Sequence, residues 1–282
     1  MKPQDKIWYI TGASKGLGLS LVKQLLAAGN KVAATSRNLQ DLQTAVGTHN
    51  GNFLPLAVDL KNEASVNNSI QTAIAAFGQI DVVVNNAGYG LIGSLEELSD
   101  EEARGNFEIN VFGMLNVIRN IMPHLRKQRS GHIFNISSIG GFSGAFPGFG
   151  IYCATKFAVV GLSESLSAEA KSFGINVTVI QPGYFRTSFL SAGSIGVPAN
   201  QLADYAEVRE SQQAHQASIN GNQPGDPEKA VAAMIEIASA EKPPLHLFLG
   251  KDAYEMADLK ILSVQNDMDN WERLATATGF DN

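Results

Sequence analysis

Short, almost continuously apolar runs alternate with amphipathic segments along the first two thirds of the chain. Six of these runs lie at residues 6–10, 31–35, 53–58, 81–85, 132–137 and 176–180. Uninterrupted apolar runs of this length are typical of strands that are buried on both faces of a parallel sheet. The pattern therefore predicts a β-strand at each of the six positions.

Segments with helical periodicity separate these runs. The predicted helices lie at residues 17–28, 62–77, about 99–126 and about 151–173. Ser99 and Glu102 form a capping-box pattern at the start of the third helix. This alternation predicts an α/β fold, in which right-handed crossovers build a doubly wound parallel sheet with helices on both faces. Ligands of such folds bind outside the carboxyl ends of the strands.

The segment at residues 184–225 interrupts the alternation. It is rich in Ser, Gly, Ala, Gln and Asn, with a few aromatic side chains, and is expected to form a lid or binding loop. After it, Asp226-Pro227 predicts the N-cap and first turn of a helix that runs to about Ala240. A strand at 245–249 and a helical tail follow. No repeat or domain boundary is visible, so one domain is expected over residues 1–282.

Composition narrows the classes of protein. The chain is 44% hydrophobic and 17% charged, and its formal net charge of −6 disfavours nucleic-acid or anionic-membrane partners. No apolar run is long enough to span a membrane, and no secretory signal is visible, so a cytoplasmic protein is expected. The single cysteine, Cys153, excludes an internal disulfide. It adjoins Tyr152, which leaves a reactive thiol as an alternative to the usual small buried hydrophobe.

The candidate chemistry centres on Tyr152, Lys156 and Ser138. Tyrosine has an unperturbed pKa of about 10 and is a poor acid or base near neutrality. A lysine four residues later in a helix lies on the same face, and its charge would lower the pKa of the tyrosine. The Ser138 hydroxyl could hold a carbonyl or alcohol oxygen. Tyrosine and lysine at this spacing also occur on ordinary helix faces. The other motifs of the sequence are therefore needed to distinguish a catalytic pair from such a face.

A glycine-rich turn follows the first predicted strand. Glycine lets a ligand approach the backbone, and the start of the next helix offers free N–H groups to a phosphate. The alternative is a glycine-rich turn without a ligand, and the spacing differs from both common nucleotide-binding motifs. The residues expected to hold a cofactor here are Gly12, Ser14, Lys15, Gly16, Leu17 and Gly18.

Ser36 and Arg37 follow the second predicted strand. NAD-selective sites usually place a carboxylate at this point to bind the adenosine ribose, and this chain has none. Arg37 would instead bind a ribose 2′-phosphate, because arginine can form two hydrogen bonds with a phosphate group. Lys15 is expected to lie near the same phosphate. NADP(H) is therefore expected rather than NAD(H). The alternative is a merely solvated arginine.

The other strand ends also carry groups that suit a dinucleotide. Asn85 is expected to bridge strands as part of the scaffold. The residues expected to contact the adenine, the cofactor backbone and the nicotinamide are, in chain order, Asp59, Leu60, Asn86, Ala87, Gly88, Pro182, Gly183 and Thr187.

Over roughly residues 6–190 the chain resembles a short-chain dehydrogenase/reductase. The motifs that carry the resemblance are TGxxxGxG from Thr11, NNAG from Asn85, the YxxxK pair and PG at Pro182-Gly183. The resemblance implies a single Rossmann-type domain and a nicotinamide cofactor. No metal site is expected. The resemblance also implies a homodimer or homotetramer, paired through the helices near 99–126 and 151–173. The catalytic tetrad that it implies falls on Asn110, Ser138, Tyr152 and Lys156, and its NADP-preferring members carry basic residues like Lys15 and Arg37.

Two details concern the surroundings of the tyrosine. Ser138 precedes Tyr152 by fourteen residues where the family commonly has thirteen, so the extra residue is expected in a bulge at 142–146. Ser137 competes for the serine role, although a structural part suits it better. The stretch FPGFGIYCATKFAV resembles the hydroxysteroid and retinol dehydrogenase branch, which says little about the substrate.

The expected function is NADPH-dependent interconversion of a carbonyl and an alcohol. Tyr152 would exchange the proton, Ser138 would hold the developing alkoxide, and Lys156 would also bind the nicotinamide ribose. Asn110 would hold a water that links Lys156 to solvent. An apolar small-molecule substrate is expected from six aromatic residues, Phe142, Phe146, Phe149, Tyr184, Phe185 and Phe189. The alternative is a dinucleotide-binding sensor without turnover, while the lack of a GxSxG motif argues against a serine hydrolase.

Overall fold

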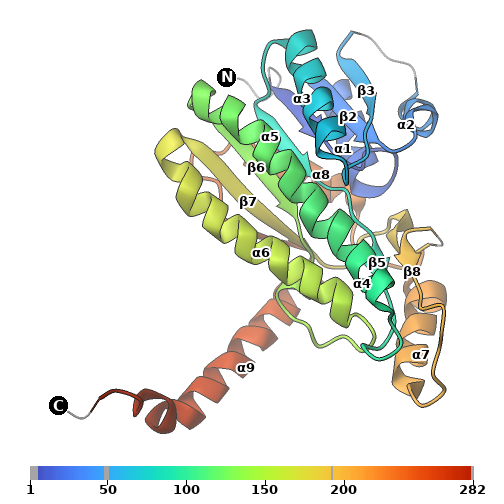
Figure 1. Ribbon diagram of the computed structural model, residues 1–282, viewed down its shortest axis with the longest axis vertical. Helices are drawn as coiled ribbons and strands as arrows, with labels where there is room; N and C mark the ends of the chain where they lie inside the picture. Colours follow the sequence, from blue (N-terminus) through green and yellow to red (C-terminus); the bar gives the residue numbers. More distant parts are fainter. Residues whose placement is uncertain (1–5, 48–50, 192, 281–282) are drawn as a thin grey trace.

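A parallel sheet between two layers of helices forms the body of the protein (Figure 1). The computed structural model describes residues 6–47, 51–191 and 193–280; residues 1–5, on which the expectation of no secretory signal partly rests, lie outside this range. Within the described residues the main sheet has seven strands in the order β3-β2-β1-β4-β6-β7-β9. Their bounds are β1 Ile7–Ile10, β2 Lys31–Ser36, β3 Phe53–Ala57, β4 Val82–Asn85, β6 Gly131–Ile136, β7 Ile175–Pro182 and β9 His246–Leu249.

Every predicted strand is confirmed, to within one or two residues at each end, and every pair of neighbours in this sheet is parallel. Successive side chains of a strand point to opposite faces. Tyr9 therefore lies in the core on one side of the sheet, while Trp8 and Ile10 lie in the core on the other. Both faces bury apolar side chains, which explains why the strands show no alternation with polar residues.

Helices cover both faces, as predicted. The helices α3 Glu63–Phe77, α5 Gly113–Gln128 and α6 Gly150–Ala170 pack on the face that Figure 1 turns to the viewer. The helices α1 Gly16–Ala27, α2 Leu39–Val46 and α8 Pro227–Ile237 pack on the opposite face. The sequence pattern had not indicated α2, which is short and carries a single buried side chain, Leu42.

The helix predicted from Ser99 to about residue 126 is divided. The capping box of Ser99 and Glu102 is present and starts α4, Asp100–Phe107. A π-helical turn at Glu108–Phe112 then joins α4 to α5. Such a turn shifts the hydrogen-bond ladder by one residue and is frequent at functional sites. A pattern based on 3.6 residues per turn cannot locate it.

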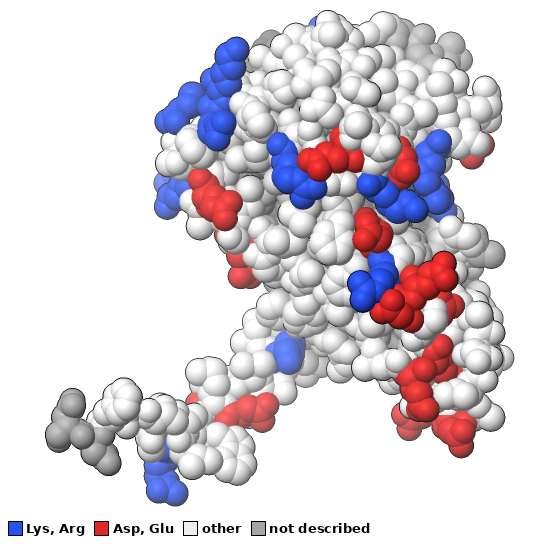
Figure 2. All heavy atoms as spheres, viewed as in Figure 1, with Lys and Arg blue, Asp and Glu red and all other residues white. Residues whose placement is uncertain are grey.

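The segment at 184–225 contains more structure than a loop. It includes the short strand β8 Ile195–Gly196, which pairs with β5 Gly90–Leu91, and the helix α7 Ala206–Gln213, which continues in a π-helical turn at Ala214–Ile219. These elements were not predicted, because β8 has only two residues and α7 is short and polar. Acidic side chains gather over α4 and α7 on the face shown in Figure 2.

The helical tail is confirmed as α9, Lys251–Thr276, which extends away from the body (Figure 1). Its first two turns bury Ala253 and Ala257. Among the described helices, none combines the length and the apolar character that crossing a bilayer requires.

Candidate active site

The strand order reverses between β1 and β4, and the two loops that follow these strands are bound together at that point. The Thr11 hydroxyl accepts hydrogen bonds from the backbone N–H groups of Asn86 and Ala87, at 3.0 and 3.1 Å. The Asn86 amide donates in return to the carbonyl oxygens of Thr11 and Gly12, both at 2.9 Å. Such a switch point at the carboxyl edge is where doubly wound folds bind ligands.

Two glycines permit this close approach. Gly12 has a φ of +65°, and a Cβ there would lie 2.7 Å from the Cα of Ala87. A Cβ on Gly18 would lie equally close to the Gly12 carbonyl oxygen. The N-terminus of α1 is thus held at the edge of the sheet. Its N-cap residue, Lys15, makes no side-chain cap, and its first turn contains no acidic residue, so the exposed backbone amides suit a phosphate group.

The two predicted phosphate-binding cations have different surroundings. Arg37 is exposed and forms no ion pair with any residue in the described ranges. Burial raises the pKa of Tyr89, and the positive charge of Arg37 partly offsets this rise. Ser36 donates a hydrogen bond to Ser14 over 3.2 Å and thereby ties the glycine loop to the start of the Arg37 turn. Lys15 instead donates to the Ser194 hydroxyl over 2.5 Å and to the Gly193 carbonyl oxygen over 3.3 Å. The sequence had not indicated that Lys15 reaches the 184–225 segment.

The remaining predicted cofactor residues lie along the same edge. The Asp59 carboxylate is exposed and accepts from the Lys61 N–H over 3.0 Å, which closes the turn after β3, and Leu60 next to it is buried. Thr187 lies next to the N-terminus of α1, because a Cβ added to Gly16 would be 3.8 Å from the Cβ of Thr187. At the end of β7, Gly183 donates its N–H to the Leu249 carbonyl oxygen over 2.9 Å.

Tyr152, Lys156 and Ser138 come together beside this edge. Tyr152 and Lys156 are buried in the first turns of α6, with the Lys156 ammonium 5.8 Å from the centroid of the tyrosine ring. The ammonium donates to the Ile136 carbonyl oxygen over 2.8 Å. Ser138 accepts from the Gly140 N–H over 3.1 Å, and a Cβ on Gly140 would lie 3.5 Å from the Ser138 hydroxyl and 3.7 Å from the Tyr152 ring, so both side chains face this glycine. Ser137 is buried and donates to the Lys156 carbonyl oxygen over 2.9 Å, which is a scaffold contact.

The electrostatics differ from the expectation that Lys156 lowers the pKa of Tyr152. Burial raises the pKa of Tyr152 far above the usual value for tyrosine, and the hydrogen bond with Ser138 is the effect that opposes the rise. Burial also lowers the pKa of Lys156 to about 8. Tyr152 therefore holds its proton throughout the neutral range, as a proton donor must.

Asn110 lies in the π-helical turn, and its side chain forms two hydrogen bonds with the backbone of Tyr89. Its amide oxygen accepts from the Tyr89 N–H over 3.0 Å, and its amide nitrogen donates to the Tyr89 carbonyl oxygen over 3.0 Å. The same nitrogen donates to Thr155 over 3.1 Å. A Cβ on Gly88 would lie 3.0 Å from the Asn110 amide oxygen and 3.6 Å from the Lys156 ammonium, so both groups face this glycine. The Asn110 side chain is thus engaged with protein atoms.

The six aromatic residues expected to form a pocket separate into groups. The rings of Phe149 and Phe189 lie 6.1 and 5.9 Å from the ring of Tyr152, and Phe146 lies 6.5 Å from Phe149. Phe142 packs edge-on against Phe248, and Phe185 packs against the core on the α1 side of the sheet. The wall around Tyr152 is therefore apolar but smaller than expected.

Two further groups adjoin Tyr152. Cys153 is buried, and burial raises the pKa of its thiol to about 11, which argues against the reactive-thiol alternative. Tyr184 is hydrogen-bonded to Nε2 of His215 over 2.9 Å, and Nδ1 of that ring is 2.7 Å from the Ser211 carbonyl oxygen. A carbonyl oxygen only accepts, so Nδ1 donates to Ser211, and this tautomer leaves Nε2 to accept from Tyr184.

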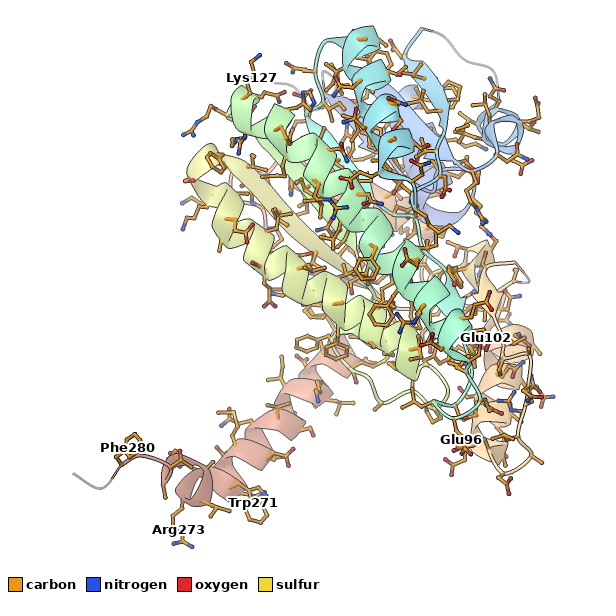
Figure 3. All side chains as sticks on the ribbon, in the orientation of Figure 1. Glu96, Glu102, Lys127, Trp271, Arg273 and Phe280 are labelled. Carbon is orange, nitrogen blue, oxygen red and sulfur yellow. The ribbon has the colours of Figure 1, made fainter. Side chains whose placement is uncertain are left out.

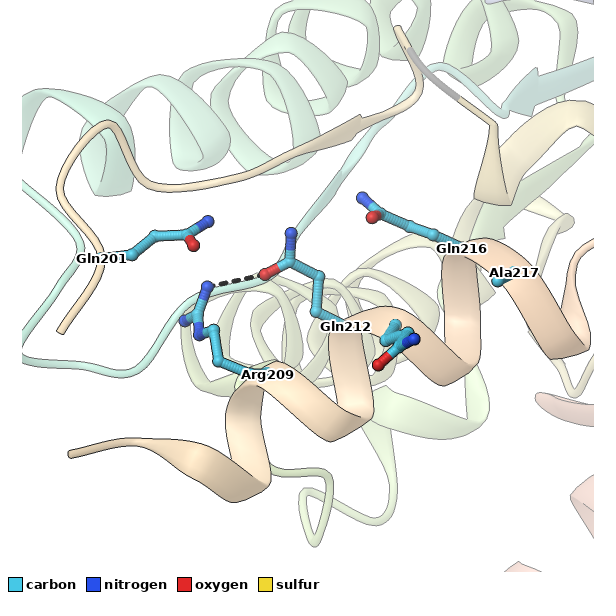
Figure 4. A pocket seen from close by; sticks show the side chains of 6 residues that line it. Gln201, Arg209, Gln212, Gln216 and Ala217 are labelled. Carbon is cyan, nitrogen blue, oxygen red and sulfur yellow. Dashed lines mark hydrogen bonds between the residues drawn. The ribbon is translucent and has the colours of Figure 1, made fainter. Parts of the chain in front are cut away.

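Two hollows lie beside α7 rather than over Tyr152. The first, of about 380 Å³, is lined by Leu95, Phe146, Tyr205 and Val208 among others and reaches the aromatic wall through Phe146. The second, of about 260 Å³, is lined by Arg209 and four glutamines, of which Gln212 accepts from Arg209 over 2.7 Å (Figure 4).

Several contacts of the site escaped the sequence reasoning. The TGxxxGxG motif contains Thr11 but does not indicate its contacts with Asn86 and Ala87. Asn106, four residues before Asn110, also donates to the Tyr89 carbonyl oxygen over 3.0 Å. A second asparagine at helical spacing was the available signal. Asp252 accepts from the Tyr184 N–H over 2.6 Å, but it lies 68 residues away in the sequence, so no local pattern could have indicated it.

Known proteins share this sequence and architecture. A sequence profile described as short chain dehydrogenase matches residues 6–194. Oxidoreductase BOA17 of Botryotinia fuckeliana is 35% identical over 276 residues, which cover 97% of this chain and 99% of that protein. The 3-ketodihydrosphingosine reductase of Bacteroides thetaiotaomicron is 37% identical over 249 residues, 88% of each chain.

Solved structures of short-chain dehydrogenases also have a similar fold. The crystal structure of a short-chain dehydrogenase from Streptomyces avermitilis is 36% identical, with a TM-score of 0.89 over 97% of this chain and 100% of that chain. Two Burkholderia dehydrogenases share the fold at 23% and 24% identity, with TM-scores of 0.80 over 95% and 0.73 over 96% of this chain, covering 97% and 98% of their own chains. The first was solved with NAD and the second with NADP.

Proposed function

Because the chain belongs to the short-chain dehydrogenase family, whose relatives are oxidoreductases, we propose that it is an NADPH-dependent enzyme that interconverts a carbonyl and an alcohol. One observation carries the proposal. Tyr152, Lys156 and Ser138 meet at the carboxyl edge of the sheet, beside the glycine loop that packs on Ala87. This arrangement supports a proton donor beside a dinucleotide site.

The residues of the edge fit such a cofactor. The close packing of Gly12 and Gly18 leaves the α1 amides open to the pyrophosphate, while Ser14 and Arg37 would hold the ribose 2′-phosphate. Lys156 and Tyr152 would bind the nicotinamide ribose. When bound, the nicotinamide supplies or accepts the hydride.

The protein would supply the proton and hold the substrate oxygen. The Ser138 hydroxyl would donate to the carbonyl oxygen, and Tyr152 would then give it a proton; a positioned acid of this kind contributes about 10²- to 10⁴-fold. The raised pKa of Tyr152 keeps the phenol protonated before the step. The Lys156 ammonium would stabilise the phenolate that remains. Asn110 would act as a positioning residue, because it fixes Tyr89 and the backbone next to Lys156.

A ketone with an apolar body suits the site. Phe149 and Phe189 flank Tyr152 and exclude water from it. The name of the Bacteroides relative specifies reduction of a keto group, which supports a ketone for this chain as well.

A panel of ketones and aldehydes with NADPH, followed by cofactor absorbance, tests the proposal. We expect saturable NADPH oxidation that Tyr152→Phe reduces at least about a hundredfold with little change in NADPH binding. Tyr254→Phe, an exposed tyrosine on α9, is the matched control and should retain full activity. NADPH binding without turnover of any carbonyl would instead favour a sensor, and full activity of Tyr152→Phe would exclude this tyrosine as the acid.

A further inference from the structure

The part of α9 that leaves the body presents an unusual apolar surface. Among the described residues, nine of the fourteen large apolar side chains that are exposed lie at or beyond Tyr254. Trp271, near the far end of the arm in Figure 3, is 62% exposed. Soluble proteins rarely expose contiguous apolar surface on this scale unless it binds something.

Five of these nine side chains form one regular row together with two alanines. Successive members of one row are separated alternately by three and four residues, which places them on a single stripe of the helix. We name this row the α9 seam; it consists of Tyr254, Ala257, Ile261, Val264, Met268, Trp271 and Ala275. A row with this spacing over three heptads is the sequence signature of a helix that packs against another helix.

The base of the seam is already packed. Ala257 is buried with Ala253 against Ile139, in the cluster next to the Ser138 turn. Beyond Ala257 every residue of the seam is exposed. Most helical stability in proteins comes from packing of an apolar face rather than from intrinsic propensity, so the outer turns need a partner.

We propose that the α9 seam packs against the seam of a second copy of this chain. A row of alternating three- and four-residue spacing is complementary to itself, and a two-fold dimer contact uses the same surface on both subunits. Charge argues against a lipid surface, because α9 carries six carboxylates and three basic side chains, whereas interfacial membrane helices are rich in lysine and arginine. This contact is separate from the family-implied pairing through α5 and α6.

Sedimentation velocity of the full chain at about 1 to 100 µM tests the proposal, because assembly depends on concentration. The seam variant is Val264→Glu with Met268→Glu. The matched control is Asn266→Glu with Asn270→Glu, which adds the same charge to exposed positions off the seam of the same helix. We expect the control to assemble like the wild type. The seam variant should form a smaller oligomer than the wild type, or its dissociation constant should be at least about tenfold higher.

A cross-linking measurement keeps the test independent of other interfaces. Val264→Cys should give a covalent dimer with a short bismaleimide, because the native Cys153 is buried. The proposal is overturned if wild type and seam variant sediment alike, or if the Val264→Cys protein gives no covalent dimer. It is also overturned if the wild type binds phosphatidylcholine vesicles through the seam without self-association.

Discussion

The phenol of Tyr184 donates a hydrogen bond to Nε2 of His215 over 2.9 Å and so joins the end of β7 to the π-helical turn after α7. His215 is buried, and its other nitrogen is held by the Ser211 carbonyl oxygen. Tyr184→Phe leaves Nε2 without its donor, and we expect a loss of about 1–3 kcal/mol in the free energy of unfolding. Urea unfolding measures it. Tyr205→Phe removes the same hydroxyl from an exposed hydrogen bond to Glu96, and equal losses in the two variants would contradict the inference.

Cofactor preference should depend on Arg37. Arg37→Asp replaces the proposed phosphate-binding cation with a carboxylate that suits free ribose hydroxyls, so we expect kcat/KM for NADPH to fall at least about tenfold while that for NADH rises. Steady-state kinetics with both cofactors measure the ratio. Arg126→Asp makes the same charge change in the last turn of α5, at the opposite end of the sheet, and should leave the ratio unchanged. An unaltered ratio in Arg37→Asp would disprove the phosphate contact.

The pKa of Lys156 predicts a pH limit. Burial disfavours the ammonium and lowers its pKa to about 8, so the charge that supports Tyr152 is lost as the pH rises through that value. We expect kcat/KM for carbonyl reduction to fall above pH of about 8, since this parameter reports the free enzyme. Initial rates between about pH 6 and 10 measure the profile, with NADPH stability checked separately. A rate that stays constant up to pH 10 would show that the ammonium is not required.

A second pH effect concerns stability and arises away from the site. His132 is buried in β6, with Nε2 2.9 Å from the Thr178 hydroxyl, and burial lowers its pKa to about 3. Between about pH 6.5 and 3 the unfolded chain binds this proton and the folded chain does not, so stability falls as the pH drops. The loss amounts to about 2 kcal/mol at pH 5, as an upper bound.

His132→Gln keeps a donor for Thr178 but removes the titration. We expect its free energy of unfolding, from urea denaturation at pH 7 and pH 5, to depend less on pH than that of the wild type. Parallel pH dependences in the two proteins would assign the acid sensitivity to other groups.

Local patterns were enough to predict the sheet. The seven main strands and the helices that cover the sheet, apart from α2, follow from apolar runs and helical periodicity, because burial on both faces dictates those residues. The glycine loop and the YxxxK pair are also short and local. In contrast, β5 and β8 have two residues each, and they pair only because the chain folds back on itself.

The contacts that surround the tyrosine could not be predicted in this way. Tyr184 meets Asp252 across 68 residues and Lys15 meets Ser194 across 179, so no spacing rule connects them. The prediction from sequence that the pKa of Tyr152 is lowered was also wrong, because this pKa is raised. Helical spacing placed a lysine nearby but gave no measure of burial, which is the largest effect.

The hydrogen bond between Lys15 and Ser194 has a consequence for protein engineering. It ties the loop that is proposed to bind the cofactor to the segment that is expected to select the substrate, so these two parts are not interchangeable modules. A chimera that takes residues 184–225 from a relative will keep its cofactor kinetics only if the graft returns a hydrogen-bond acceptor to Lys15.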